Sequence, residues 1–227
     1  SRLKDPTVET RLREYVDKQG KKLGSWDKVL ISDVVTDKNK QFVGMSVLQA
    51  QKHVEKDAFE FMRDILIEES GRVGMVTFMM KEENLKKILA HPLVGIGCDG
   101  SAMAPYGPLG EGKPHPRSYG SFPRVLGKYV RDEKIISMTQ MIKKITSNPA
   151  KKFGFEKRGV LQTGYNADIV IFDEANVIDQ ATFEQPHQYS RGIEYVLVNG
   201  QVVINREEHT GNLPGQVLRK KAETKKS

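Results

Sequence analysis

The sequence predicts an α/β fold with a parallel sheet, followed by a mostly β region. Residues 73–79 read as a strand, residues 82–90 as a helix that ends before Pro92, and residues 93–98 as a second strand. A strand, a helix and a strand in succession make a βαβ unit, in which the two strands run parallel in one sheet. After Arg158 the chain becomes rich in β-branched residues with turn signals between them, and it looks like a separate small region.

The N-terminal third of the chain predicts mainly helices. Pro6 is expected at the first helical position of a helix over residues 5–18, where proline is tolerated. Residues 26–35 are rich in β-branched side chains and predict a strand. Asp57 is expected to cap a helix with an apolar stripe, which Gly71 ends. The other expected elements are a polar turn at 38–41 and a short helix at 47–54.

The residues after position 98 predict a long loop, then helices and a hairpin. Residues 100–120 carry glycine and proline at short intervals, and loops longer than about 15 residues in a compact domain are usually functional or disordered. Asn199 and Gly200 form a strong turn signal between two β-rich runs. The other expected elements are helices at 122–131 and 137–145, a short capped helix at 147–154, a strand at 167–173 and a hairpin over 194–204.

Composition and charge exclude several classes of partner. The 227 residues carry a net charge of +7, with 36 basic residues interspersed among 29 acidic ones. The surplus lies in short patches such as 143–144, 151–152 and 219–226 that are not interleaved with aromatic residues, so we expect a solvated surface and no nucleic acid. No apolar run approaches the roughly 18 residues of a membrane helix, so we expect no membrane partner. Cys98 is the only cysteine, which excludes a disulfide framework and fits a reducing compartment such as the cytoplasm.

Asp99 is the first candidate for a chemical role. It directly follows an apolar run and precedes Gly100, at the expected boundary between a strand and a loop. Functional groups of parallel sheets gather at the carboxyl ends of the strands. A buried carboxylate would need a metal, an arginine or backbone N–H groups as its partner. Asp99 is therefore a candidate metal-bound carboxylate or general base, with loop-holding or helix-capping as the alternative.

His115 and Arg117 lie in the long loop, within KPHPRSYGSFPR. A guanidinium offers a rigid fork for a carboxylate, so Arg117 could hold a substrate acid group or pair with Asp99, and a plain loop salt bridge is the alternative. His115 stands between two prolines, which favours a role in shaping the loop over metal binding. Cys98 is expected to pack as a small side chain and not to act as a nucleophile. The chain contains no H-x-H and no H-E-x-x-H, so no complete histidine-based zinc site can be read from it.

Five segments, in this order, resemble the C-terminal half of the D-aminoacylases, the N-acyl-D-amino-acid deacylases of the amidohydrolase superfamily: GCDGSAMAP, HPRSYGSFPRVLGKYVR, ITSNPAKKFGF, RGVLQTGYNADIVIFD and GIEYVLVNGQVV. The resemblance extends forward through FMMKEENLKKILAHPLV and covers nearly the whole chain. ADIVIFD followed by VNG indicates only an amidohydrolase. The HPR-x-x-G-x-FPRVLG block is narrower and points to the aminoacylase group.

The resemblance implies the C-terminal part of a metal-dependent (β/α)₈ barrel with a helical lid insertion, followed by strands of a small β-sandwich. It implies a lid at 1–72, the last barrel strands and helices at 73–158, and a C-terminal β region at 159–227. The implied reaction hydrolyses the amide bond of a small-molecule N-acyl-D-amino acid to a carboxylate and a D-amino acid, with one or two zinc ions. Asp99 would bind metal and move a proton from water to the leaving nitrogen, and Arg117 would grip the α-carboxylate of the substrate.

The family's other metal ligands, which are mainly histidines on earlier strands, have no counterpart in this sequence. We therefore expect a fragment that is inactive alone and does not retain zinc. Two alternatives stay open. One is a non-catalytic fold remnant that binds a partner or, through Arg117, a small acid; the other is one chain of a split deacylase whose N-terminal partner chain supplies the histidines. Open strand edges also predict self-association.

Overall fold

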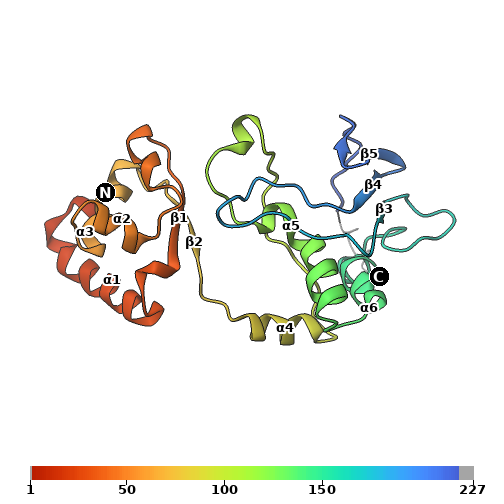
Figure 1. Cartoon of the computed structure of the whole chain (residues 1–227), viewed down its shortest axis with the longest axis horizontal. Helices are drawn as coiled ribbons and strands as arrows, with labels where there is room; N and C mark the ends of the chain where they lie inside the picture. Colours follow the sequence, from red (N-terminus) through yellow and green to blue (C-terminus); the bar gives the residue numbers. More distant parts are fainter. Residues whose placement is uncertain (1, 220–227) are drawn as a thin grey trace, which may run out of the picture. The chain divides into compact units, whose positions relative to one another are not determined.

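The computed structural model describes residues 2–219, which fall into two compact units (Figure 1). Each unit joins segments that are far apart in the sequence. Unit 1 holds the residues up to Lys81 together with Ser101–Pro116 and Thr182–His187, and unit 2 holds Glu82–Gly100, Arg117–Ala181 and the residues from Gln188 onward. The end of the basic tail, at 220–226, lies outside the described residues.

Unit 1 contains the predicted N-terminal helices. Its α-helices and strands are α1 (Glu9–Leu23), β1 (Val29–Asp33), α2 (Val47–His53), α3 (Ala58–Glu68) and β2 (Gly74–Thr77). Its 3₁₀ helices are η1 (Arg2–Lys4), η2 (Pro6–Val8), η3 (Trp26–Lys28), η4 (Asp37–Phe42) and η5 (Gly107–Gly110). The Asp57 carboxylate accepts a hydrogen bond from the Glu60 N–H as the N-cap of α3, which confirms the predicted cap. Pro6 opens η2, whereas α1 itself begins at Glu9 and ends at Leu23, so the helix expected over residues 5–18 starts and ends later than predicted. The predicted strand at 26–35 is shorter than expected, because Ser25 caps a 3₁₀ turn at Trp26–Lys28.

The core of unit 1 forms where α2 and α3 pack against β1. Phe42 and Phe61 meet edge to face with ring centroids 5.3 Å apart, a favourable arrangement for aromatic pairs. The only tryptophan of the chain, Trp26, packs against this core. The buried core residues are Val29, Ile31, Val34, Phe42, Val47, Ala50, Phe61 and Ile65.

Glu69, directly after α3, is a buried carboxylate that holds the loop following β1. Its side chain accepts hydrogen bonds from the backbone N–H groups of Val35 and Thr36, at 2.6 and 3.0 Å, and from the Thr36 hydroxyl. The Asn39 amide adds a bond of 2.7 Å. Burial alone would raise the pKa of Glu69, but these hydrogen bonds outweigh it and lower the pKa to about 2. Glu69 therefore stays ionised and fixes residues 35–39 against α3.

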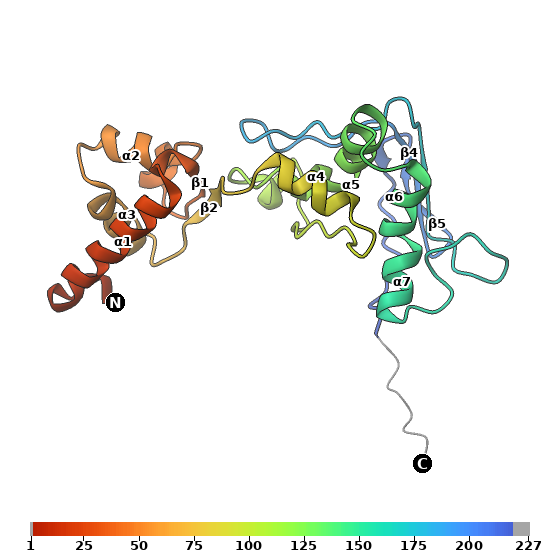
Figure 2. The same ribbon diagram turned by 90° about the horizontal axis from the view of Figure 1, so that it is seen from below.

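Unit 2 combines helices with a four-stranded antiparallel sheet in the order β3-β4-β5-β6. Figure 2 shows α6 and α7 following one another along nearly the same line. Asn199 and Gly200 both have positive φ, +48° and +80°, and they form the predicted turn between β4 and β5. The elements are α4 (Glu82–Ala90), α5 (Arg117–Arg124), the π-helix η6 (Val125–Asp132), α6 (Met138–Ile145), α7 (Ser147–Phe153), β3 (Ile169–Phe172), β4 (Ile193–Val198), β5 (Gln201–Asn205) and β6 (Glu208–His209).

The predicted parallel βαβ unit is wrong for the described residues. Helix α4 has the expected bounds, but β2 pairs antiparallel with β1 and residues 93–98 form no strand. A strand exists only where a neighbour accepts and donates its backbone hydrogen bonds, and none of the described strands pairs with 93–98. The mixed helix and strand content agrees with an α/β protein. The barrel, lid and sandwich, and the boundaries at 72 and 158, remain predictions.

Gly127, in η6, lies against the chain that leaves β3. A Cβ at this position would come within 2.3 Å of the carbonyl oxygen of Val177 and 2.6 Å of Ile178 Cδ1. The same carbonyl oxygen accepts a hydrogen bond of 2.7 Å from the Arg131 guanidinium. The contact between η6 and residues 177–178 therefore requires glycine.

Gly127→Ala is expected to lower the free energy of unfolding of unit 2 by about 1–3 kcal/mol, because overpacking outweighs the better helix propensity of alanine. Urea titration followed by far-UV circular dichroism measures this loss. Gly215→Ala is the matched control, since a Cβ there would meet nothing within 4 Å, and it should change stability by less than about 0.5 kcal/mol. Equal stability of the two variants would contradict the close contact.

Candidate active site

The backbone at Asp99 and Gly100 explains why these two residue types stand together. Asp99 has φ of +48°, a left-handed conformation that aspartate tolerates better than most side chains. At Gly100 a Cβ would lie 3.0 Å from the Cα of Ser118 and 3.3 Å from the carbonyl oxygen of Arg117. Any larger residue at Gly100 would push the loop away from the first turn of α5. The Asp-Gly pair thus lets residue 99 lie beside the start of that helix.

Asp99 forms an ion pair with Arg117, with Asp99 Oδ2 2.9 Å from Arg117 Nη2. The Asp99 side chain is 87% exposed and that of Arg117 is 44% exposed, so the expectation of a buried carboxylate is wrong. The reason is that residues 93–98 do not form the buried strand that would have carried Asp99 into a sheet. Of the partners expected for this carboxylate, the structure shows the arginine. A pocket of about 200 Å³ in the same unit is lined by Phe155 and Leu218 among others, and its lining includes neither Asp99 nor Arg117.

His115 and Cys98 make contacts of other kinds. His115 belongs to unit 1, where its ring meets Phe183 edge to face at 5.0 Å, and Phe183 meets Phe78 at 4.6 Å. This aromatic contact agrees with a role for His115 in shaping the loop. Cys98 is partly buried, and its sulfur accepts a hydrogen bond of 3.4 Å from the Gly100 N–H. It packs locally, as predicted.

The described residues do not fit a zinc site by themselves. Within residues 2–219, no three or more histidine, cysteine, aspartate or glutamate side chains come together closely enough to hold a metal ion. Catalytic zinc usually has three protein ligands. Asp99 offers one carboxylate, and a cation already neutralises it. In the same part of the chain, no helix has the length and apolar character that a membrane crossing requires.

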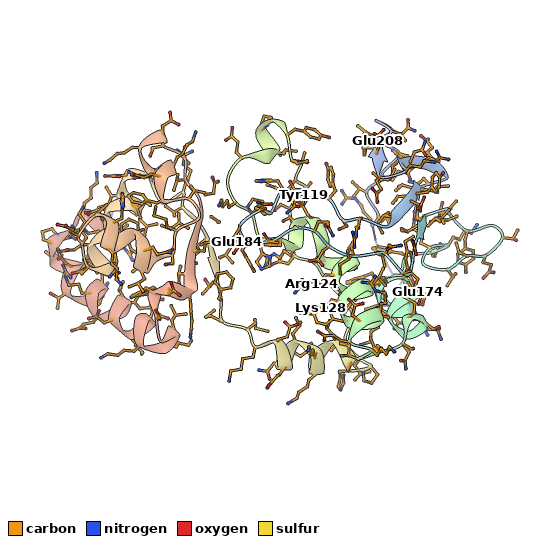
Figure 3. The ribbon with its side chains drawn as sticks, viewed as in Figure 1. Tyr119, Arg124, Lys128, Glu174, Glu184 and Glu208 are labelled. Atoms are coloured by element: carbon orange, nitrogen blue, oxygen red, sulfur yellow. The ribbon has the colours of Figure 1, made fainter. Side chains whose placement is uncertain are left out.

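A polar cluster that the sequence did not predict ties α4 to η6. Glu82 Oε1 accepts hydrogen bonds from Lys128 Nζ at 2.6 Å and from the buried Tyr129 hydroxyl at 2.8 Å. The bond from Lys128 is the main reason why the pKa of Glu82 lies below its usual range. In the turn before, Arg124 Nη1 pairs with Asp179 Oδ2 at 3.1 Å (Figure 3 labels Arg124 and Lys128). These residues of the FPRVLGKY segment thus hold the scaffold on which Arg117 begins the helix.

A second set of motif residues, the Arg158 clasp, fastens the sheet. It consists of Arg158, Asp168 and Asn199. Arg158 forms an ion pair with Asp168 and donates a hydrogen bond of 2.6 Å to the Asn199 side-chain oxygen. Asp168 in turn accepts a bond of 2.9 Å from the Asn199 N–H. The segments RGVLQTGYNADIVIFD and VNG therefore meet at the turn between β4 and β5, where they stabilise the fold.

Known proteins resemble this chain over most of its length. A model of the amidohydrolase family matches residues 19–204. An N-acyl-D-aspartate deacylase of Alcaligenes xylosoxydans xylosoxydans is 37% identical over 169 residues, which cover 72% of this chain and 32% of that protein. A D-aminoacylase from the same organism is 41% identical over 157 residues, or 69% of this chain and 31% of that protein.

The solved structure of a deacylase also resembles this chain. The crystal structure of an N-acyl-D-glutamate deacylase from Bordetella bronchiseptica, complexed with zinc and a phosphonate inhibitor, matches with a TM-score of 0.74 at 35% identity. The match covers 88% of this chain and 39% of that one. The chain thus spans about a third of the length of the curated relatives it matches.

Proposed function

This chain belongs to the amidohydrolase family, and on that premise we propose that it is the C-terminal part of a zinc-dependent N-acyl-D-amino-acid deacylase. The complete enzyme would add water to the amide carbonyl and break the C–N bond, releasing a carboxylate and a D-amino acid. The relatives that match most of this chain support the proposal, since they are deacylases of N-acyl-D-amino acids.

The ion pair between Asp99 and Arg117 is the observation that supports this function best. It brings a carboxylate that can accept a proton next to a guanidinium that can bind an acid group, at 2.9 Å. With the α-carboxylate of the substrate on Arg117, the amide nitrogen on the same carbon lies within a few bonds of that contact. Asp99 would then take a proton from the attacking water and deliver it to the leaving nitrogen. Arg117 would orient the substrate.

Zinc belongs to the proposal for the complete enzyme, and we propose that this chain alone does not hold it. A structural neighbour is complexed with zinc, whereas the described residues contribute one exposed carboxylate near the site. The remaining ligands would come from the rest of the barrel.

A second candidate function is a non-catalytic module that binds a small acid through Arg117. Two observations on the described residues favour this function: Arg117 binds a carboxylate, and no group of metal ligands is present among them. A separate alternative is a split deacylase, in which another chain supplies the histidines.

The deciding experiment compares two proteins. One is this chain alone, and the other is a longer protein in which an N-terminal segment with an H-x-H motif precedes this chain. We expect the longer protein to contain zinc and to release D-amino acids from N-acetyl-D-amino acids, with little release from the L-forms. We expect no turnover by the 227-residue chain alone. A longer protein that contains zinc but hydrolyses no N-acyl-D-amino acid would contradict the deacylase function.

A further inference from the structure

We propose that Ser190 is a positioning residue: its hydroxyl supplies the hydrogen bond that Pro123 cannot make inside α5. The bond holds the first turn of this helix, on which Arg117 lies. The inference rests on the proposed function, because it takes Arg117 to orient the substrate. It adds a residue from the segment before β4, 71 positions after the carbonyl group that it bonds to.

Pro123 lies inside the helix and cannot act as a backbone donor there. In an α-helix each N–H donates to the carbonyl oxygen four positions earlier, which for position 123 is that of Tyr119. Proline has no N–H, and its ring also pushes against that carbonyl. Helix α5 ends one residue later, at Arg124, and the chain continues as the π-helix η6. The carbonyl of Tyr119 therefore depends on another donor.

Ser190 provides such a donor. Its Oγ donates a hydrogen bond of 3.1 Å to the carbonyl oxygen of Tyr119, in a half-buried contact (Figure 3 labels Tyr119). The preceding residue contacts the same turn, because the ring centroids of Tyr189 and Tyr119 lie 5.9 Å apart. Two neighbouring residues before β4 thus hold the first turn of α5.

The backbone around Ser190 is itself fixed, which suits a positioning role. Arg191 exchanges two backbone hydrogen bonds with Ile178, of 3.1 and 3.3 Å. Next to Ile178, the side chain of Asp179 packs so closely on α5 that a Cβ at Gly120 would come within 2.4 Å of it. Ser190 therefore belongs to a support that is bonded together on its own side of the helix. Such support keeps a functional side chain in place.

The Ser190 bond should matter more than a similar bond to a regular helix. An acceptor that loses its partner inside the protein costs the desolvation of that group as well as the bond. In a regular helix the amide four positions further on would still donate to the carbonyl, and Pro123 removes this second donor. Loss of the Ser190 hydroxyl should therefore let the first turn of α5 move, and Arg117 with it.

A double-mutant cycle in the 227-residue chain tests the bond. Ser190→Ala should lower the equilibrium constant for folding by about 2- to 12-fold in urea titrations, because a neutral hydrogen bond contributes this much. Pro123→Ala restores an N–H that can donate to Tyr119, so in that background Ser190→Ala should cost less than about 2-fold. Thr210→Val is the matched control, since it removes a hydroxyl that donates to another carbonyl, that of Val202, at 2.8 Å. Its cost should be the same in both backgrounds.

Equal costs of Ser190→Ala in the two backgrounds would overturn the inference. If Pro123→Ala does not fold, two variants of nearly equal shape decide instead. Ser190→Thr keeps the hydroxyl and Ser190→Val lacks it. Equal stability of these two variants would also overturn the inference.

In the longer protein, the same variants separate positioning from stabilisation. Ser190→Val should raise KM for N-acetyl-D-alanine by about 2- to 12-fold with kcat nearly unchanged, because a displaced Arg117 weakens binding of the substrate acid group. Ser190→Thr should restore KM, and Thr210→Val should leave it at the wild-type value. An unchanged KM in Ser190→Val would contradict the positioning role. Missing turnover in the unmutated longer protein contradicts the proposed function instead, and the cycle still decides on the Ser190 bond, so the two failures are distinguishable.

Discussion

Under the proposed function, Asp99→Asn in the longer protein is expected to lower kcat by about 10²- to 10⁴-fold, the usual contribution of a positioned general acid–base group. Asparagine matches the size of aspartate and tolerates the φ of +48°, so the backbone should stay in place. It has no carboxylate to accept the proton of the attacking water. Steady-state kinetics with N-acetyl-D-amino acids, with zinc content measured in parallel, give the result.

The same variant should show opposite effects on chemistry and on binding. Turnover should fall because the proposed base is lost, whereas a carboxylate inhibitor that is not hydrolysed should bind as well as before or better. Asp132→Asn should keep both near the wild-type values, since Asp132 pairs with Arg131 and not with Arg117. Near-normal turnover of Asp99→Asn would remove this residue from the mechanism.

Glu69→Gln is expected to lower the free energy of unfolding of unit 1 by about 2–3 kcal/mol, because hydrogen bonds to a buried charged group contribute this much. The backbone donors of Val35 and Thr36 and the amide of Asn39 would lose the carboxylate that they share. Trp26 is the only tryptophan and packs on the core of unit 1, so its fluorescence during urea titration reports on this unit.

Glu68→Gln is the control for this variant. Glu68 is the preceding residue, its side chain is 37% exposed, and it pairs with Lys38 at 2.6 Å. Its replacement should cost less than about 1 kcal/mol, as for other exposed pairs. Equal losses for the two variants would show that Glu69 acts through net charge and not through its hydrogen bonds.

Low pH should lower the stability of the chain through the same carboxylate, that of Glu69. The pKa of Glu69 is about 2 in the folded chain against an ordinary value of 4.5, so the folded state binds the proton more weakly. The stabilisation by Glu69 is then complete above pH 4.5 and is lost as the pH falls from 4.5 toward 2. The urea midpoint of the wild-type chain should fall over this range, and that of Glu69→Gln should fall less.

Local signals in the sequence predicted local structure well. Asp57 caps its helix, and Asn199 with Gly200 forms the hairpin turn, because each of these features depends on neighbours within a few residues. The expected strand at 93–98 failed for the opposite reason. A strand depends on a partner segment that the spacing of apolar residues does not reveal.

The structure tests the contact between the two candidate site residues but not their chemical roles. Pairing of Asp99 with Arg117 was one of the stated alternatives, but the exposure of Asp99 was not expected. The roles of Glu69 and Gly127 had no sequence signal, because their partners lie about 30 or more positions away along the chain. The chemical roles of Asp99 and Arg117 still await the kinetic tests.

The Arg158 clasp has a consequence for separating active from inactive relatives by sequence. Among the described residues, Arg158 pairs with Asp168 and bonds to Asn199, Asp168 accepts a bond from the Asn199 N–H, and the Asn199 amide donates to the carbonyl oxygen of Pro214. A related protein without hydrolytic activity would still need these three side chains to stabilise the turn between β4 and β5. A search pattern built on these three residues would therefore find inactive as well as active relatives. Under the roles proposed for Asp99 and Arg117, a pattern that includes these two residues would separate the two groups better.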